Sequence, residues 1–210
     1  MSDLTASFLE ATKARRTFYA LEAKCPVPDS QIISLAEQAL LNVPSAFNNQ
    51  STRMTVLLKS EHDKLWDIVA SALLAKIGQE RFNAGTKDRI AGFKNAYGSI
   101  LFWDDSGTVD GLEKSSGPLY ADKAQEWTHQ SNGMHQYYMW VALETYGLGV
   151  NLQHYNPLID EEVKKTWGLP GHWNLKAHMV FGTKKDGSTL QEKEQKLEMA
   201  DRLKVFGADV

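Results

Sequence analysis

The chain has 210 residues, of which 42% are hydrophobic and 23% are charged, and its formal net charge is −3. This balance is typical of a folded water-soluble protein and argues against disorder. It also lacks the large basic surface that nucleic acids or anionic membranes attract. We therefore expect one domain that spans residues 1–210.

Cysteine usage and the N-terminal segment bear on the cellular compartment. Cys25 is the only cysteine, so no internal disulfide and no paired-cysteine redox or zinc motif can form. The first 16 residues lack the basic start and apolar run of a secretory signal, and no stretch approaches the roughly 20 apolar residues of a membrane helix. We expect a cytoplasmic protein that does not contact membranes.

The first third of the chain predicts two helices and a polar loop. Residues 4–14 form the first helix, which ends at Arg15-Arg16. A second helix follows Pro28, with Asp29 as its N-cap and Pro44 as its stop. Residues 45–51 then form a polar loop.

The middle of the chain alternates strands and helices. Residues 54–58 are predicted as a short buried strand, and Ser60 as the N-cap of a long helix. A less regular helix covers residues 87–95. Residues 99–103 form a central strand that Asp104-Asp105 stops, and residues 104–118 form a loop or short helix.

Residues 133–146 are apolar on nearly every side, which is typical of a helix buried in a core or an interface. The other predictions for the second half are helices at 122–129 and 157–167, extended segments at 150–155 and 177–181, and an amphipathic helix at 189–205. Strands separated by helices indicate an α/β or α+β sheet with helices around it, whose strand order the sequence does not reveal.

Several common catalytic motifs are absent. Residues 182–187 are followed by Ser188 rather than lysine, so they are no phosphate-binding P-loop. The Gly147-Leu-Gly149 pair has Leu152 where a dinucleotide-binding fingerprint requires glycine. There is no GxSxG nucleophile motif. The six histidines form no HExxH motif and no i, i+4 pair, so we expect no metal site, and Cys25 has no nearby base that would make it a nucleophile.

Four polar or glycine-containing segments remain as candidate site residues. Arg15, Arg16 and Thr17 follow a helix, and two guanidinium groups with a hydroxyl suit a phosphate. The alternative is that the two cations only stabilise the helix C-terminus. The second segment, Pro44-Ser-Ala-Phe-Asn-Asn-Gln-Ser51, carries amides that can pair with the donors and acceptors of a flavin ring, or it is an ordinary polar turn.

The third segment runs from Tyr146 to Pro157 and begins with Gly147-Leu-Gly149. Glycines here either let the backbone approach a flat ligand or only cap the helix. The fourth, Phe181-Gly-Thr-Lys-Lys185, follows the last strand. Its lysines either complete a phosphate site or lie in a solvated turn.

Taken in order, these four segments resemble the nitroreductase family, with its RRS/T phosphate motif, its PSxxNxQ loop, its helix ending in GLG and its late FG strand with basic residues. The segments RRTFYAL, PSAFNNQSTR, AYGSILFWDD and GVNLQHYNP are closer still to the short fungal and bacterial nitroreductases, which include yeast proteins of lipid signalling and oxidative stress.

The resemblance implies an α+β fold, with a central mixed or antiparallel sheet sandwiched by helices, and an intertwined homodimer with two FMN molecules in its interface. It places the phosphate at Arg15, Arg16 and Thr17, with Lys184 or Lys185 assisting. Further cofactor contacts are implied at Tyr19, Ser45, Ala46, Phe47, Asn48 and Gln50, the loop residues coming from the partner subunit, and at Gln153 and His154 near the flavin N5 and O4 atoms.

Two positions depart from the family pattern. Many relatives read QPW where this chain has Gln50-Ser51-Thr52, so the substrate face does not transfer. The basic residue near the flavin N1/O2 edge has no clean match, and we take Arg89 as the candidate and Lys94 as its rival.

The implied activity is NAD(P)H-dependent reduction of nitroaromatic compounds, by ping-pong hydride transfer through flavin N5 and without a catalytic side chain. The alternatives are a quinone, enone or azo reductase on the same scaffold, a flavin-binding regulator with little turnover, and an interaction protein without cofactor. The expected partners are a second copy of the chain and a small aromatic substrate, and we expect no nucleic acid, membrane or metal partner.

Overall fold

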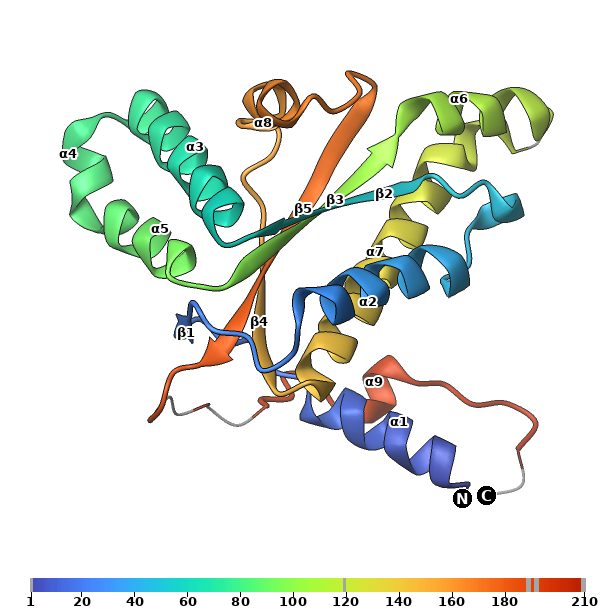
Figure 1. Cartoon of the computed structure of the whole chain (residues 1–210). Helices are drawn as coiled ribbons and strands as arrows, with labels where there is room; N and C mark the ends of the chain where they lie inside the picture. Colours follow the sequence, from blue (N-terminus) through green and yellow to red (C-terminus); the bar gives the residue numbers. More distant parts are fainter. Residues whose placement is uncertain (1, 119, 188–189, 191–192, 209–210) are drawn as a thin grey trace.

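The computed structural model describes residues 2–118, 120–187, 190 and 193–208 (Figure 1). Its helices are α1 (Asp3–Ala14), α2 (Asp29–Asn42), α3 (Ser60–Ile77), α4 (Gln79–Arg81), α5 (Lys87–Lys94), α6 (Ser106–Ser115), α7 (Ala124–Thr145), α8 (Asp160–Trp167) and α9 (Met199–Arg202), with shorter helical turns η1 (Ala46–Asn48), η2 (Phe82–Thr86) and η3 (Ala121–Lys123). Its strands are β1 (Leu21–Glu22), β2 (Thr52–Leu58), β3 (Gly98–Asp105), β4 (Leu148–Gln153) and β5 (Trp173–Lys184).

The five strands form one sheet in the order β1-β5-β3-β2, with β4 paired to β5 as well. Every pairing is antiparallel. Strand β5 therefore lies at the centre and hydrogen-bonds to β1, β3 and β4. This arrangement confirms the expected α+β sheet and settles it as antiparallel.

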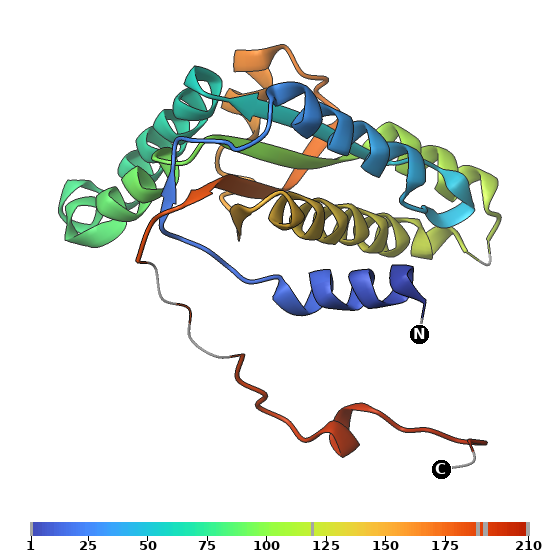
Figure 2. The same ribbon diagram turned by 60° about the horizontal axis from the view of Figure 1, so that its bottom comes forward.

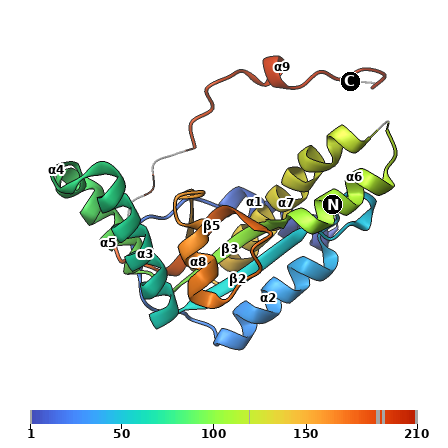
Figure 3. The ribbon, with the colours of Figure 1, turned by 90° about the horizontal axis from the view of Figure 1, so that it is seen from above.

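Helices cover both faces of the sheet. Side chains alternate between the two faces along a strand, and in β3 the side chains on both faces are apolar and need to be buried. Leu101 and Trp103 of β3 point into a core formed with α3, α5 and α8. Ile100 and Phe102, which alternate with them, point into a second core formed with α2 and α7. Figures 1 and 3 show these two groups of helices on opposite sides of the strands.

Two predicted N-caps are wrong. Asp29 is the first residue of α2 and does not cap it, because its carboxylate accepts a hydrogen bond from Lys59 Nζ at 2.6 Å and another from the Tyr97 hydroxyl. Ser60 is the first residue of α3, whose N-cap is Lys59 with φ of +54° and no side-chain cap bond. Tertiary ion pairing thus replaces local capping at Asp29.

The predicted boundaries also shift in the middle of the chain. The two helices predicted at 122–129 and 133–146 are one continuous helix, α7. Asp104 and Asp105 do not end the central strand but are its last two residues. Both carboxylates are buried and paired: Asn132 Nδ2 donates to Asp104 at 2.7 Å, and Arg53 Nη2 donates to Asp105 at 2.6 Å.

The helix predicted at 189–205 is wrong for the described part of that range, where only Met199–Arg202 is helical. Residues 189 and 191–192 lie outside the described residues. Leu197, Leu203 and Phe206 are exposed, and Figure 2 shows this segment running away from the sheet. A short amphipathic segment with no surface to cover lacks the packing that stabilises most protein helices.

Helix α1 contacts α7, but none of its residues is buried. Leu4, Phe8 and Leu9 are exposed, and Phe8 belongs to a wide apolar groove of about 960 Å³ that runs along the outer face of α7. Met139 and Leu143 on the inner face of α7 are fully buried, whereas Met134 and Tyr137 on the outer face are exposed.

Among the described residues, no helix is both long and apolar enough to cross a membrane.

Candidate functional site

Three of the four candidate segments meet at one end of the sheet. The Phe18 N–H donates to the Val150 carbonyl at 2.9 Å, and the Lys185 N–H donates to the Ala20 carbonyl at 3.0 Å. Leu21 pairs with Lys184 in the sheet. Residues 15–21 therefore lie against both β4 and β5.

The glycines of Gly147-Leu-Gly149 serve the fold at this point. Gly147 has φ of +83° at the end of α7, which suits a glycine cap. A Cβ atom on Gly149 would lie 2.6 Å from Leu21 Cδ2 and 3.0 Å from Phe18 Cβ. Gly149 thus lets residues 18–21 come close to β4. In these contacts the glycine makes room for another segment of the protein and not for a ligand.

The Arg15-Arg16 pair faces the half-buried carboxylate of Glu144, which no sequence motif indicated. The Arg16 N–H lies 3.2 Å and 3.0 Å from the two Glu144 carboxylate oxygens, and Trp140 Nε1 donates to Glu144 at 2.8 Å. Burial raises the pKa of Glu144, against the lowering effect of these bonds and of the charges on Lys184 and Arg15.

The cations around Glu144 lie over aromatic rings. The Arg15 guanidinium carbon is 4.7 Å from the centroid of Trp140, and Lys184 Nζ is 4.4 Å from the centroid of Phe18. Both geometries fit cation–π contacts. With Arg16 and Lys185 nearby, this end of the sheet carries more positive than negative charge, which suits an anionic group.

A cavity of about 480 Å³ opens beside the same segment. It is lined by Tyr19, Arg89, Gly92, Phe93 and Gln153, so three of the residues singled out by sequence share it. His154, which follows Gln153, is exposed. Of the two rival basic residues, Arg89 lines the cavity, whereas Lys94 forms an ion pair with Asp67 at 2.5 Å and is not part of the lining.

Two buried polar residues hold the rim of this cavity. The Asn151 amide donates to the Phe18 carbonyl at 2.8 Å and accepts from Gln153 Nε2 at 2.9 Å. His178 Nδ1 lies 3.0 Å from the Gln153 carbonyl, which it can reach only as a donor. Burial lowers the pKa of His178 to about 4, so the ring is neutral at physiological pH. Asn151 and His178 are each polar residues next to apolar residues within a strand, and this pattern could have indicated them from the sequence.

The remaining segment, residues 45–50, has an unusual backbone. Phe47, Asn48 and Gln50 have φ of 52°, 52° and 51°, in the left-handed region that non-glycine residues rarely adopt. The loop is held by a bond of 2.9 Å from the Gln50 N–H to Ser45 Oγ. Strain of about 1–3 kcal/mol per residue persists only where the surroundings enforce it, and such residues cluster at ligand sites.

Arg53, just after the candidate loop in the sequence, is the side chain that fixes this loop. Its guanidinium donates to the carbonyls of Gln50 at 2.5 Å and Thr52 at 3.1 Å. These two bonds come from Nη1, and Nη2 of the same guanidinium donates to Asp105 at 2.6 Å. Arg53 thus ties the strained loop to the end of β3.

The structure therefore divides the predicted residues into two groups. The loop group, Ser45 to Gln50, lies by the first half of α7, where Ala46 and Phe47 share a pocket with Ser131. The basic group contacts α7 at Glu144, which is thirteen positions after Ser131, or about 20 Å along the helix. Within one chain the two groups thus contact different parts of α7.

Neither metal ligands nor a reactive thiol stand out in the described part of the chain. It holds no group of three or more His, Cys, Asp or Glu side chains placed to bind a metal ion. Burial raises the pKa of the half-buried Cys25 thiol, which favours its unreactive protonated form.

The chain is similar in sequence to known proteins over most of its length. Residues 12–183 match the profile of the Nitroreductase family. The Saccharomyces cerevisiae protein HBN1, described as a nitroreductase, is 35% identical over 180 residues, which are 85% of this chain and 88% of the relative.

Solved structures share the fold. The nitroreductase CinD from Lactococcus lactis, in complex with nicotinic acid, superposes with a TM-score of 0.85 at 39% identity and covers 95% of this chain and 99% of its own. Further CinD structures contain chloramphenicol or 4-nitrophenol. A structure from Desulfovibrio desulfuricans, described as a nitroreductase in complex with FMN, has a TM-score of 0.63 at 19% identity and covers 93% of this chain and 94% of its own, which is a likeness of fold alone.

Proposed function

Because the chain belongs to the nitroreductase family, we propose that it is an FMN-dependent oxidoreductase that uses NAD(P)H to reduce nitroaromatic compounds. The observation that carries this proposal is the meeting of a basic segment and a cavity at one end of the sheet. Tyr19, Arg89 and Gln153 line the cavity, and Arg15 and Arg16 lie just before Tyr19 in the chain.

The basic segment fits a phosphate. Arg15, Arg16 and Thr17 would hold it with charge-assisted and neutral hydrogen bonds, and Lys184 or Lys185 would add a further positive charge. The Glu144 carboxylate leaves this cluster with excess positive charge and orients the Arg16 backbone.

The cavity fits one edge of the cofactor ring. Arg89 would bring a positive charge to the ring, and Gln153, whose carbonyl bonds to His178, would contact the ring together with His154. When bound, FMN supplies the hydride chemistry that no side chain of this protein can perform. The protein residues would bind the ring, orient it and exclude water.

We also propose that the protein works as a homodimer. Ser45, Asn48 and Gln50 share a cavity with His135, which lies nine positions before Glu144, or about 14 Å along α7. They are therefore apart from the basic segment of their own chain, and a second copy would bring them to it. The apolar groove of about 960 Å³ along α7 offers a surface for this contact, with Tyr137 and Met134 in its lining. Such a large exposed apolar surface is a typical mark of a protein interface.

The first test of the dimer is its size at low concentration. We expect elution at twice the 23.5 kDa chain mass, and monomers for Tyr137→Asp because it places a charge in the apolar groove. Leu158→Asp is the matched control, since Leu158 is exposed to a similar extent (42% against 45% for Tyr137) but lies outside the groove. A wild-type monomer that still carries flavin would contradict the shared site.

The activity is tested by the visible spectrum of the purified protein and by NAD(P)H oxidation with acceptors. We expect a yellow protein and faster turnover with a nitroaromatic than with matched quinone, enone or azo compounds. Faster turnover with one of those would reassign the substrate class. Bound FMN without turnover on any acceptor would indicate a flavin-binding regulator, and a colourless protein after FMN reconstitution would rule out the proposed cofactor.

Arg16→Ala is expected to weaken FMN binding by about 1.5–3 kcal/mol, because it removes a charge-assisted hydrogen bond to the phosphate. This corresponds to a rise of about 10- to 150-fold in the Kd measured by flavin fluorescence titration. Lys13→Ala removes a cation from the exposed last turn of α1 and should keep the wild-type Kd. An unchanged Kd in Arg16→Ala would remove Arg16 from the site.

A further inference from the structure

Three aromatic side chains from separate segments meet beside the strained loop. The ring centroids of Phe47 and Trp127 lie 5.8 Å apart, those of Tyr120 and Trp127 5.8 Å apart, and those of Phe47 and Tyr120 6.4 Å apart. All three pairs are tilted by 46–49°, within the range of favourable aromatic contacts. Despite these contacts, 68% of Phe47 and 42% of Tyr120 remain exposed.

The exposure of Phe47 is imposed by the backbone. Its φ of 52° costs free energy for a residue with a side chain, and the bonds of Ser45 and Arg53 to Gln50 hold the loop in this shape. Glycine at position 47 would adopt the same φ without strain, so the backbone shape alone does not require phenylalanine there. The loop therefore holds a large aromatic ring in the open beside Trp127.

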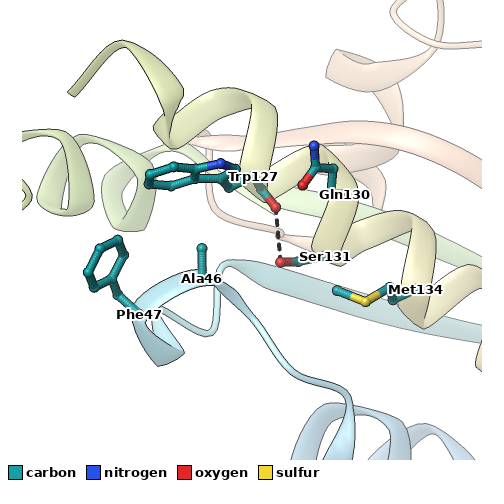
Figure 4. A pocket seen from close by; sticks show the side chains of 6 residues that line it. All are labelled: Ala46, Phe47, Trp127, Gln130, Ser131 and Met134. Carbon is teal, nitrogen blue, oxygen red and sulfur yellow. Dashed lines mark hydrogen bonds between the residues drawn. The ribbon is translucent and has the colours of Figure 1, made fainter. Parts of the chain in front are cut away.

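A pocket of about 410 Å³ lies next to these rings, lined by Ala46, Phe47, Trp127, Gln130, Ser131 and Met134. Figure 4 shows Phe47 and Trp127 reaching the pocket from different segments, with the small Ala46 beside them. The Ser131 hydroxyl is already bonded to the Trp127 carbonyl at 3.0 Å. The available surface is thus aromatic and thioether, with the Gln130 amide as its polar group.

The charge around the pocket favours an uncharged occupant. None of the six lining residues is ionisable. Gln130 Nε2 donates to the Glu126 carboxylate at 3.3 Å, and Lys123 Nζ lies 3.7 Å from the same carboxylate, so the charges beside the pocket already pair with each other. An anion in the pocket would lose its hydration with no charged group in the lining to pair with. A flat neutral ring can stack on Trp127 or Phe47 and bury its apolar faces at no such cost.

We propose that this pocket binds an uncharged flat aromatic ring, and that Trp127 and Phe47 determine which acceptors the enzyme prefers. The proposal rests on the proposed reductase function, since Ser45, Asn48 and Gln50 of the same loop are the residues that would reach the cofactor of a second copy. The pocket would then present the aromatic acceptor beside that cofactor, while the basic segment holds the phosphate elsewhere.

Steady-state kinetics with chosen acceptors test the proposal. The ratio of kcat/KM for 4-nitrobenzamide to kcat/KM for ferricyanide should fall about tenfold or more in Trp127→Ala, mainly through KM, because one stacking face is lost. Trp127→Phe should restore most of the ratio. The wild-type enzyme should also prefer 4-nitrobenzamide to the anionic 4-nitrobenzoate. An unchanged ratio in Trp127→Ala would overturn the proposal.

A binding measurement separates failure of this pocket from failure of the proposed activity. Benzamide, which carries no nitro group, is added to the purified protein without NAD(P)H while tryptophan fluorescence is recorded. We expect a saturable change in the wild type and in Trp167→Phe, a control on α8 outside the pocket, and no such change in Trp127→Phe. The absence of a saturable change in the wild type would overturn the pocket even if the enzyme reduces nitroaromatics.

Discussion

Replacement of Trp66 by alanine is expected to lower the free energy of unfolding by about 3–5 kcal/mol, because it removes a fully buried aromatic side chain and leaves a cavity. Trp66 packs against Phe93 at 4.9 Å between ring centroids and against Tyr155 at 5.8 Å. Its Nε1 also donates to Ser99 Oγ at 3.2 Å. Urea denaturation followed by circular dichroism would measure the loss.

The Trp66→Ala effect should also reach the candidate site, because Phe93 lines the cavity of Tyr19 and Arg89 and would lose its support. Trp66→Phe is the control: it keeps most of the packing and should cost less than half as much. Addition of indole should raise the melting temperature of Trp66→Ala but not of the wild type, since an apolar cavity can bind an apolar ring. A loss below about 1 kcal/mol in Trp66→Ala would contradict this account of the core.

His178 is expected to make the protein less stable as the pH falls from about 6.5 to about 4. Burial lowers its pKa from 6.5 to about 4 in the folded protein, so between these values the unfolded chain binds a proton that the folded chain excludes. Stability is therefore unaffected by this group above about pH 6.5 and decreases below it. The full shift corresponds to about 3 kcal/mol.

The test compares His178→Gln with the wild type by urea denaturation at several pH values. Glutamine can still donate to the Gln153 carbonyl but cannot be protonated, so the stability advantage of the wild type over the variant should shrink as the pH falls from 7 to 4.5. The pKa values of His62 and His135 are also lowered by burial, and their contributions cancel in the comparison because both proteins contain them. A constant difference at every pH would show that His178 does not titrate as described.

Periodicity in the sequence predicted most helices and strands but not where tertiary contacts set their limits. The break predicted between 129 and 133 does not exist, because Asn132 in the middle of α7 turns inward and donates to Asp104. The same contact lets Asp104 remain within β3 instead of ending it. A residue's long-range partner, which one sequence does not reveal, decided both boundaries.

The candidate site was predictable in part, for a similar reason. Short motifs drew attention to Arg16 and Gln153, and the structure places their segments together. Glu144 belongs to no motif, and Asn151 and Arg53 lie inside recognised segments without being distinguished from their neighbours. Glu144 and Asn151 bond to backbone groups far away in sequence, and Arg53 joins its own loop to the distant Asp105. Residues that orient others through the main chain leave no local pattern to read.

The central position of β5 has a consequence for how the chain is made. β5 is the last strand in the sequence, yet it hydrogen-bonds to β1, β3 and β4, so most of the sheet is held together by a segment that leaves the ribosome after the others. Until it arrives, β1 and β4 have no sheet partner, and β3 is paired with β2 alone. Long-range pairing of this kind slows folding and exposes strand edges to other chains. Nascent chains halted before residue 173 should therefore depend on chaperones far more than the finished protein does.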